Sequence, residues 1–229
     1  MFGFLASSRY MGWFGKLPSV GDFAGRGLPP PLRETVHKWI SSGMAALARS
    51  RPGDWRDVYQ VSPVWHFAIN AGIWDKPALI GCLAPSVDKV GRYSPLLALR
   101  SVDRRGIDKV LPPDSRWLYR IDAALRSVIG ERMPVDHVLG ALKRQTHGDG
   151  GDNSTAGILG DLGISDGALL PCKEWFSWPD LPALFNERAD RSFWWAEPAP
   201  KLPPRQIIHC GPPDDDLFCL LMNGGGVAT

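Results

Sequence analysis

Residues 77–102 read PALIGCLAPSVDKVGRYSPLLALRSV, which places two apolar runs on either side of one polar connection. Continuous apolar runs of this length are typical of strands that are covered on both faces of a sheet. A connection as short as PSVDKVGRY favours neighbouring antiparallel strands, because a parallel crossover needs a dozen or more residues. The polar residues between two core strands therefore need a reason in chemistry, ligand binding or the bonding of a tight turn.

Strand and helix patterns surround this stretch. The run VYQVSPVWHFAIN, residues 58–70, alternates in part and predicts a third strand beside the other two. Apolar residues at helical spacing follow the prolines at 29–31 and stop before Arg51, which predicts a helix. Similar stripes predict one helix that starts near Trp117 and another that Pro134 opens. RSFWWAE and RQIIHCG indicate two late strands, whereas DLFCLLMN fits a helix or a strand.

These patterns predict a single compact domain over residues 1–229, an α/β fold with helices packed on a mixed central sheet. Glycines and prolines between Trp13 and Pro31 predict repeated turns. The ends, residues 1–11 and 224–229, are expected to be flexible, and the Gly-rich segment 148–167 is expected to be a long loop.

Composition excludes several classes of function. The chain has 229 residues, of which 22% are charged, and its net charge of +2 gives no reason to expect a nucleic-acid partner. No apolar run approaches the ~20 residues of a membrane helix, and the N-terminal FGFLA is shorter than a signal-peptide core, so neither membrane insertion nor export is expected. The ten tryptophans are interpreted mainly as core residues. The four scattered cysteines, with no CxxC pair, suit a reducing compartment.

Motifs for cofactors and catalysis do not match. Gly15-Lys16 lacks the other residues of a phosphate-binding loop, and DGGDNS lacks an oxygen ligand that a calcium loop needs. No metalloprotease or serine-elbow pattern is present, so no catalytic residue, metal site or cofactor is predicted. His66, within PVWHFAI, is interpreted as a sheet histidine hydrogen-bonded to a neighbour.

Two polar connections, residues 16–26 and 86–92, share the same mixture of glycine, hydroxyl, aspartate and basic residues. In a structural interpretation, Asp22 and Asp88 accept backbone N–H groups, and Gly21 and Gly91 permit positive φ. Arg92 is suited to hold a carboxylate. In a functional interpretation, the two connections form a polar surface for a protein partner. Either way we expect a rigid polar corner, whose backbone groups need side-chain partners; its predicted members are Lys16, Ser19, Asp22, Ser86, Asp88 and Arg92.

The segments GWFGKLPSVGDF, PVWHFAI, PSVDKVGRYSPL and RSFWWAE, in this order, resemble the signature of the TagF family. These are accessory proteins of the bacterial type VI secretion system. The resemblance runs from Gly12 to about Trp195 and marks the polar corner as part of the family signature. It also marks a second set of residues, expected to form turns and packing contacts: Gly15, Pro18, Gly21, Phe23, Trp65, Gly91, Tyr93, Pro95, Trp194 and Trp195.

The resemblance implies a three-layer α/β sandwich and a cytoplasmic, non-enzymatic regulator from a Gram-negative bacterium. Family members repress type VI secretion after translation, through a scaffold protein with a forkhead-associated domain. Some relatives are fused to a PP2C-type phosphatase, so any phosphatase function here would belong to a separate partner pathway.

Two alternatives stay open at this point. The first is a hydrolase that uses a loop aspartate or a serine, Ser19 or Ser86, with a distant histidine. The second is an anion sensor in which Lys16 and Arg92 grip a phosphate.

Overall fold

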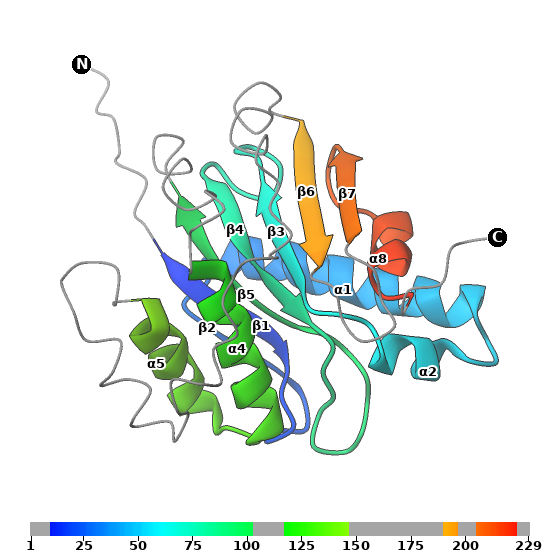
Figure 1. The fold of residues 1–229 in the computed structure, drawn as a ribbon, viewed down its shortest axis with the longest axis horizontal. Coiled ribbons are helices and arrows are strands. Elements are labelled where there is room, and N and C mark those ends of the chain that lie inside the picture. Colours follow the sequence, from blue (N-terminus) through cyan, green and yellow to red (C-terminus); the bar gives the residue numbers. More distant parts are fainter. Residues whose placement is uncertain (1–9, 103–116, 147–189, 197–204, 224–229) are drawn as a thin grey trace, which may run out of the picture.

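The computed structural model describes residues 10–102, 117–146, 190–196 and 205–223 (Figure 1). The expected flexible ends at 1–9 and 224–229 and the expected loop at 148–167 lie outside these residues. The described strands are β1 (Met11–Lys16), β2 (Phe23–Arg26), β3 (Trp65–Ile69), β4 (Ala78–Ala84), β5 (Leu96–Val102), β6 (Arg191–Ala196) and β7 (Arg205–Cys210). The described helices are α1 (Pro30–Ser50), α2 (Trp55–Gln60), α4 (Trp117–Gly130), α5 (Val135–Thr146) and α8 (Asp215–Leu221).

The strands form one sheet in the order β2-β1-β5-β4-β3-β6-β7. Every pairing among the described strands is antiparallel, so the sheet is antiparallel and not mixed as expected. The α/β fold class itself is confirmed. The physical reason is the length of the connections: β3, β4 and β5 follow one another through turns that are too short for a parallel crossover. The two late strands extend the sheet beyond β3, since β6 pairs with β3 and β7 pairs with β6.

Helices cover both faces of the sheet, which gives the three layers expected (Figure 1). Helices α4 and α5 pack on one face, and α1, α2 and α8 pack on the other. The strands serve both cores because successive side chains point to opposite faces. In β6, for example, Trp195 belongs to the core beneath α4, whereas Trp194 belongs to the core beneath α1.

The element boundaries differ from the sequence prediction near both ends of the sheet. Residues 58–60 form the end of helix α2, not a strand, and only Trp65–Ile69 of that run is β3. Tyr59 explains the wrong prediction. Its ring is buried in the core, so the buried and exposed residues around it alternate along the sequence as they would in a strand. The Gly-rich connection contains a short strand, β2, that the prediction missed. Strand β1 also includes Met11, which the prediction placed in a flexible end.

Most of the described tryptophans are core residues, as predicted. Among the described tryptophans, only Trp55 is not buried. Trp39 of α1, Trp194 of β6 and Phe218 of α8 form an aromatic cluster in which the Trp39 ring centroid lies 5.7 Å from Trp194 and 5.2 Å from Phe218. The ring contacts therefore connect the first helix, a late strand and the last described helix.

Gly15 allows β1 to approach β5 closely. Its φ is +143°, and a Cβ at this position would lie 2.2 Å from the Pro95 carbonyl oxygen. We expect Gly15→Ala to lower the free energy of unfolding by more than about 2 kcal/mol, since backbone strain adds to a clash with main chain.

Gly21→Ala is the matched control in urea unfolding. Gly21 does not have positive φ, contrary to the prediction, and no atom lies within 4 Å of a Cβ built there. We expect its effect to stay within about 0.5 kcal/mol. Equal losses for the two variants would contradict this account of the contact between β1 and β5.

Candidate functional site

The Asp88 carboxylate is the centre of the polar corner. Its side chain is 0% exposed, and it accepts two cationic partners, Lys16 Nζ at 3.1 Å and Arg92 Nε at 2.7 Å. Two backbone N–H groups also donate to it, from Val90 at 3.0 Å and from Arg92 at 2.9 Å. A buried carboxylate needs this many donors because the protein interior solvates charge poorly.

The turn around Asp88 folds in this way because Gly91 has a φ of +83°, which side-chain-bearing residues rarely adopt. The Asp88 N–H donates to the Arg92 carbonyl at 3.0 Å, and the Gly91 N–H donates to the Asp88 carbonyl at 3.0 Å. Val87 and Tyr93 then form an isolated antiparallel bridge. The connection between β4 and β5 is therefore a closed turn that presents its donors to one carboxylate.

The turn at 86–92 is bonded to the first polar connection, which is distant in sequence. Ser86 Oγ donates to the Lys16 carbonyl at 2.8 Å, and the Lys89 N–H donates to the Val20 carbonyl at 2.8 Å. The Arg92 guanidinium donates to the Gly21 carbonyl. Together with the ion pair of Lys16, these bonds hold the two connections as one unit, which we call the Asp88 corner: Lys16, Val20, Gly21, Ser86, Asp88, Lys89 and Arg92.

Helix α2 supports the corner from below. The buried Tyr59 hydroxyl donates to the Ser86 carbonyl at 3.1 Å and accepts from the Ser86 N–H at 3.0 Å. Burial raises the pKa of Tyr59, so the phenol stays protonated. The sequence analysis missed Tyr59 because it assigned this segment to a strand.

Two of the predicted corner residues bond elsewhere. Ser19 Oγ donates to the Met133 carbonyl at 2.8 Å, which fastens the connection to the turn between α4 and α5. Asp22 is exposed, and its carboxylate accepts only the adjacent Phe23 N–H, at 2.7 Å, among the described residues. The structure thus brings four of the six predicted residues together and leaves Ser19 and Asp22 outside the buried ion pair.

Some of the residues expected to form turns and packing contacts border the corner, and others lie in the interior. The Phe23 ring lies 5.4 Å from Lys16 Nζ and stacks on Phe14, with ring centroids 5.5 Å apart. The Tyr93 ring meets Tyr59 edge to face, at 5.7 Å. The Pro95 carbonyl accepts the Lys16 N–H at 3.4 Å. The remaining members are buried in the interior: Pro18, Trp65, Trp194 and Trp195.

The charge state of Asp88 follows from these contacts. Burial opposes ionisation, but hydrogen bonds from the Arg92 backbone and side chain and from Lys16 outweigh it and hold the pKa of Asp88 well below its usual range. Asp88 is therefore ionised at neutral pH and draws two cations to the corner.

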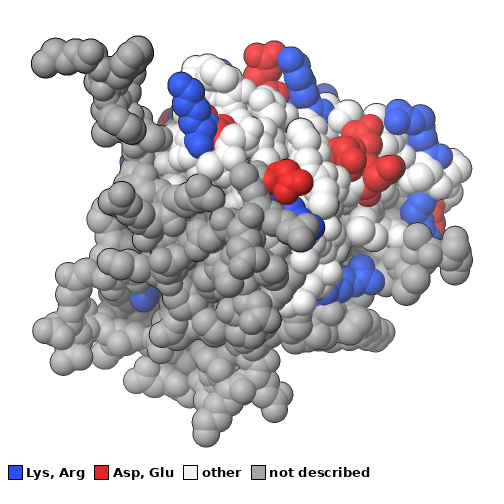
Figure 2. Space-filling view, turned by 90° about the horizontal axis from the view of Figure 1, so that it is seen from above, with Lys and Arg blue, Asp and Glu red and all other residues white. Residues whose placement is uncertain are grey.

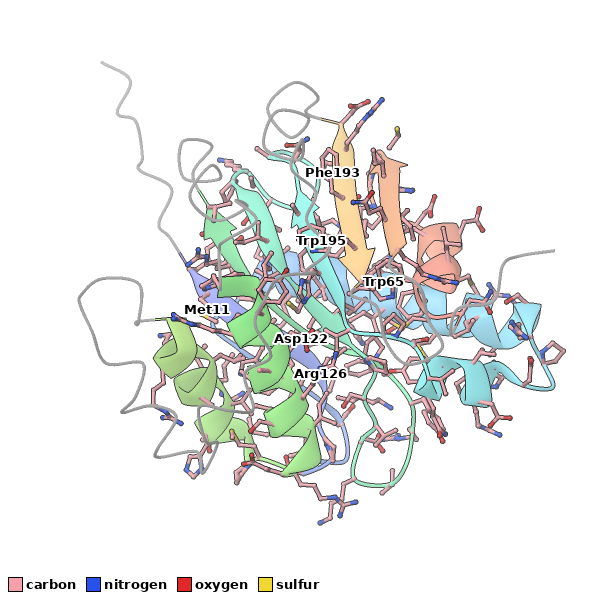
Figure 3. The ribbon with its side chains drawn as sticks, in the orientation of Figure 1. Met11, Trp65, Asp122, Arg126, Phe193 and Trp195 are labelled. Carbon is pink, nitrogen blue, oxygen red and sulfur yellow. The ribbon has the colours of Figure 1, made fainter. Side chains whose placement is uncertain are left out.

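A second buried ionic group lies on the other face of the sheet. His66 of β3 is fully buried, and its Nε2 lies 3.1 Å from Asp122 Oδ2, while Arg126 Nε donates to Asp122 Oδ1 at 2.5 Å. Figure 3 shows Asp122 and Arg126 on α4, the helix that covers this face. Burial opposes ionisation of Asp122, but the bonds from His66 and Arg126 outweigh it and lower its pKa.

This arrangement confirms the interpretation of His66 as a sheet histidine bonded to a neighbour. The prediction did not identify its partners, although the four-residue spacing of Asp122 and Arg126 is a usual helical ion pair. The contact joins α4 to the middle of the sheet.

The geometry of a serine hydrolase is not present at the two serines that the sequence suggested. Within the described residues, Ser19 and Ser86 donate to main-chain carbonyls and neither hydroxyl bonds an imidazole. The described residues also contain no group of three potential metal ligands. Within the same ranges, no helix has the length and apolar character to cross a bilayer.

On the described part of the face in Figure 2, acidic and basic side chains lie near one another instead of forming a field of one sign. Figure 2 shows blue and red side chains interspersed over the described part of one face. This distribution favours a contact with local complementarity over a contact with a polyanion.

Comparisons with known proteins agree with the fold. The model of the TagF N-terminal domain, described as type VI secretion system-associated, matches residues 12–145, more than half of the chain. The crystal structure of PA0076 from Pseudomonas aeruginosa PAO1 is similar, with a TM-score of 0.69 and 26% identity over 96% of both chains. No curated protein matches the chain.

The family match and the fold thus define a type VI secretion-associated protein of α/β sandwich architecture. The chain belongs to the TagF N-terminal domain family.

The first prediction for the corner concerns Asp88→Ala. This change leaves Lys16 buried without a counter-ion and four donors without an acceptor. Breaking a buried pair in this way commonly costs ~3–5 kcal/mol, so we expect a loss of that size in urea unfolding. Asp22→Ala is the control, and since Asp22 is exposed we expect a change within about 0.5 kcal/mol.

The second prediction concerns pH. Because the folded protein lowers the pKa of Asp88, the ionised carboxylate stabilises the fold above the pKa of the unfolded chain, about 3.9. That contribution is lost as pH falls from there through the folded pKa. We expect the difference in unfolding free energy between the unchanged protein and Asp88→Asn to shrink as pH falls from 6 to 3. A difference that stays constant over this range would contradict the buried carboxylate.

Proposed function

We propose that this protein is a post-translational repressor of type VI secretion that works in the cytoplasm of a Gram-negative bacterium by binding a scaffold protein with a forkhead-associated domain. It performs no reaction of its own in this proposal. Repression follows from mass action, because a scaffold held by the repressor is withdrawn from assembly.

The Asp88 corner is the observation that carries the proposal. Three residues of the family signature, Lys16, Asp88 and Arg92, form an ion cluster around the Asp88 carboxylate, which is 0% exposed. Their polar groups are already bonded, and these bonds join the two surface connections. Such an arrangement fixes a shape, as a binding protein requires, and the one serine of the corner, Ser86, donates its hydroxyl to a main-chain carbonyl.

The Asp88 corner also has exposed groups at its surface. The Arg92 side chain is 58% exposed although one nitrogen is bonded to Asp88, and Gly21, Asp22 and Lys89 are exposed beside it. A partner that meets these groups finds them in a single conformation, which lowers the entropy lost on binding. Phosphatase activity, where it is needed, belongs in this proposal to a separate PP2C-type protein.

The proposal predicts that the purified protein retains the scaffold in an affinity capture and that overproduction silences secretion in cells. Arg92→Ala is the informative variant, because its exposed side chain can be removed while Lys16 still balances Asp88. We expect it to fold and to lose at least about tenfold in affinity for the scaffold.

Arg49→Ala is the matched control, an exposed arginine in the last turn of α1 that should bind unchanged. Unaltered secretion on overproduction together with no retention of the scaffold would make the proposal wrong. If Arg92→Ala fails to fold, the corner is architecture and the contact lies elsewhere.

A further inference from the structure

Strand β2 is one of the two edges of the sheet and lies next to the Asp88 corner. It spans only Phe23–Arg26 and pairs with β1 alone in the described sheet. An edge strand has one row of main-chain N–H and C=O groups without a neighbouring strand. The corner holds the start of β2 in place, since Arg92 donates to the Gly21 carbonyl.

The register shows which groups point outward. The Lys16 N–H donates to Pro95 and the Lys16 carbonyl accepts from Ser86, so the main chain of Lys16 faces β5. Its opposite residue on β2, Phe23, therefore turns its own N–H and C=O away from β1. By alternation, Gly25 does the same. The outer row of β2 consists of the main-chain groups of Phe23 and Gly25.

Two side chains partly cover this row. Asp22 Oδ1 accepts the Phe23 N–H at 2.7 Å, and Arg26 Nη1 donates to the Gly25 carbonyl at 3.0 Å. Both side chains are exposed, so these caps are weak and are easily exchanged. Between these two capped groups, the Phe23 carbonyl and the Gly25 N–H point outward from the edge of β2.

The edge forms the side of a groove. A cavity of 620 Å³ runs along Val20–Arg26, with Arg33 of α1 on one side and Val135 of α5 on the other. The Phe14 ring, stacked on Phe23, lines it as well. Residues of both helical layers, Arg33 of α1 and Val135 of α5, thus line the cavity beside the open edge.

Charged side chains of both signs lie around the groove, Arg26 and Arg33 together with Asp22 and Asp136. Within the described residues, Arg33 has no ion pair. The neighbouring Glu34 pairs with Lys38 instead, at 2.7 Å. Arg26 pairs with the exposed Asp136 at 3.2 Å. A carboxylate beside an apolar side chain would meet Arg33 and the pair of phenylalanine rings.

We propose that the partner binds by adding an extended segment to β2, with an apolar side chain against Phe14 and Phe23 and an acidic side chain at Arg33. This inference rests on the proposed function, since it names the surface through which the scaffold is held. Main-chain bonds to Phe23 and Gly25 supply affinity, and the two side chains supply selectivity.

Deuterium exchange on the full-length protein tests the main-chain part, with and without the purified scaffold. We expect the amide of Gly25 to exchange at least about tenfold more slowly when the scaffold is bound, because it would then donate to another strand. Residues 205–210 of β7, the opposite edge, are the internal control and should not change.

Charge reversal tests the side-chain part. We expect Arg33→Glu to lower the affinity for the scaffold at least about tenfold, and Arg49→Glu, on the same helix, to leave it unchanged. Thermal unfolding of both variants establishes that they are folded.

The outcomes separate the two proposals. A scaffold that binds tightly without protecting residues 23–26 overturns the docking on β2 and leaves the repressor function standing. Protection of Gly25 that is insensitive to Arg33→Glu keeps the added strand and overturns the acidic side chain. No binding of the scaffold overturns both proposals.

Discussion

One buried carboxylate organises the end of the sheet. Asp88 is withdrawn from water and kept ionised by Lys16, Arg92 and two main-chain N–H groups. Its donors come from two segments separated by about seventy positions, so the carboxylate positions both at once. Arg92, one of these donors, also bonds the Gly21 carbonyl just before β2, so the carboxylate and the start of β2 share a partner.

The two buried ionic groups described above have similar roles at different places in the sheet. At the sheet end, Asp88 joins two connections, whereas on the opposite face Asp122 joins α4 to His66 in the middle of β3. Burying charge is costly, and such groups favour one arrangement over its competitors because an alternative packing would leave them unpaired. This specificity suits a protein whose proposed role is to present a fixed surface.

Sequence reasoning located the strands where apolar runs were continuous and failed where a single buried residue imitated the pattern. The runs at β4 and β5 are unambiguous because both faces of these strands are covered. The strand prediction was wrong around Tyr59, because one buried aromatic residue in a short helix gives the same local pattern as a strand. Within the corner, residue type indicated that charges would meet, but it did not distinguish Asp88 from Asp22, because burial depends on the turn's neighbours in space. The His66 partner was missed for the same reason: Asp122 is distant in sequence.

The contact between the first and last helices has a consequence for synthesis on the ribosome. Trp39 of α1 donates its indole N–H at 2.9 Å to the Asp214 carbonyl, which is 175 positions later, and Gly43 lies against Phe218. Until β6 has emerged, β3 lacks its neighbour, and until α8 has emerged, α1 lacks its contact with Phe218. A nascent chain that stalls after residue 145, where the family match ends, would display the uncovered parts of α1 and β3 to chaperones and proteases. Completion of the carboxyl-terminal part thus sets the moment at which the polypeptide escapes quality control.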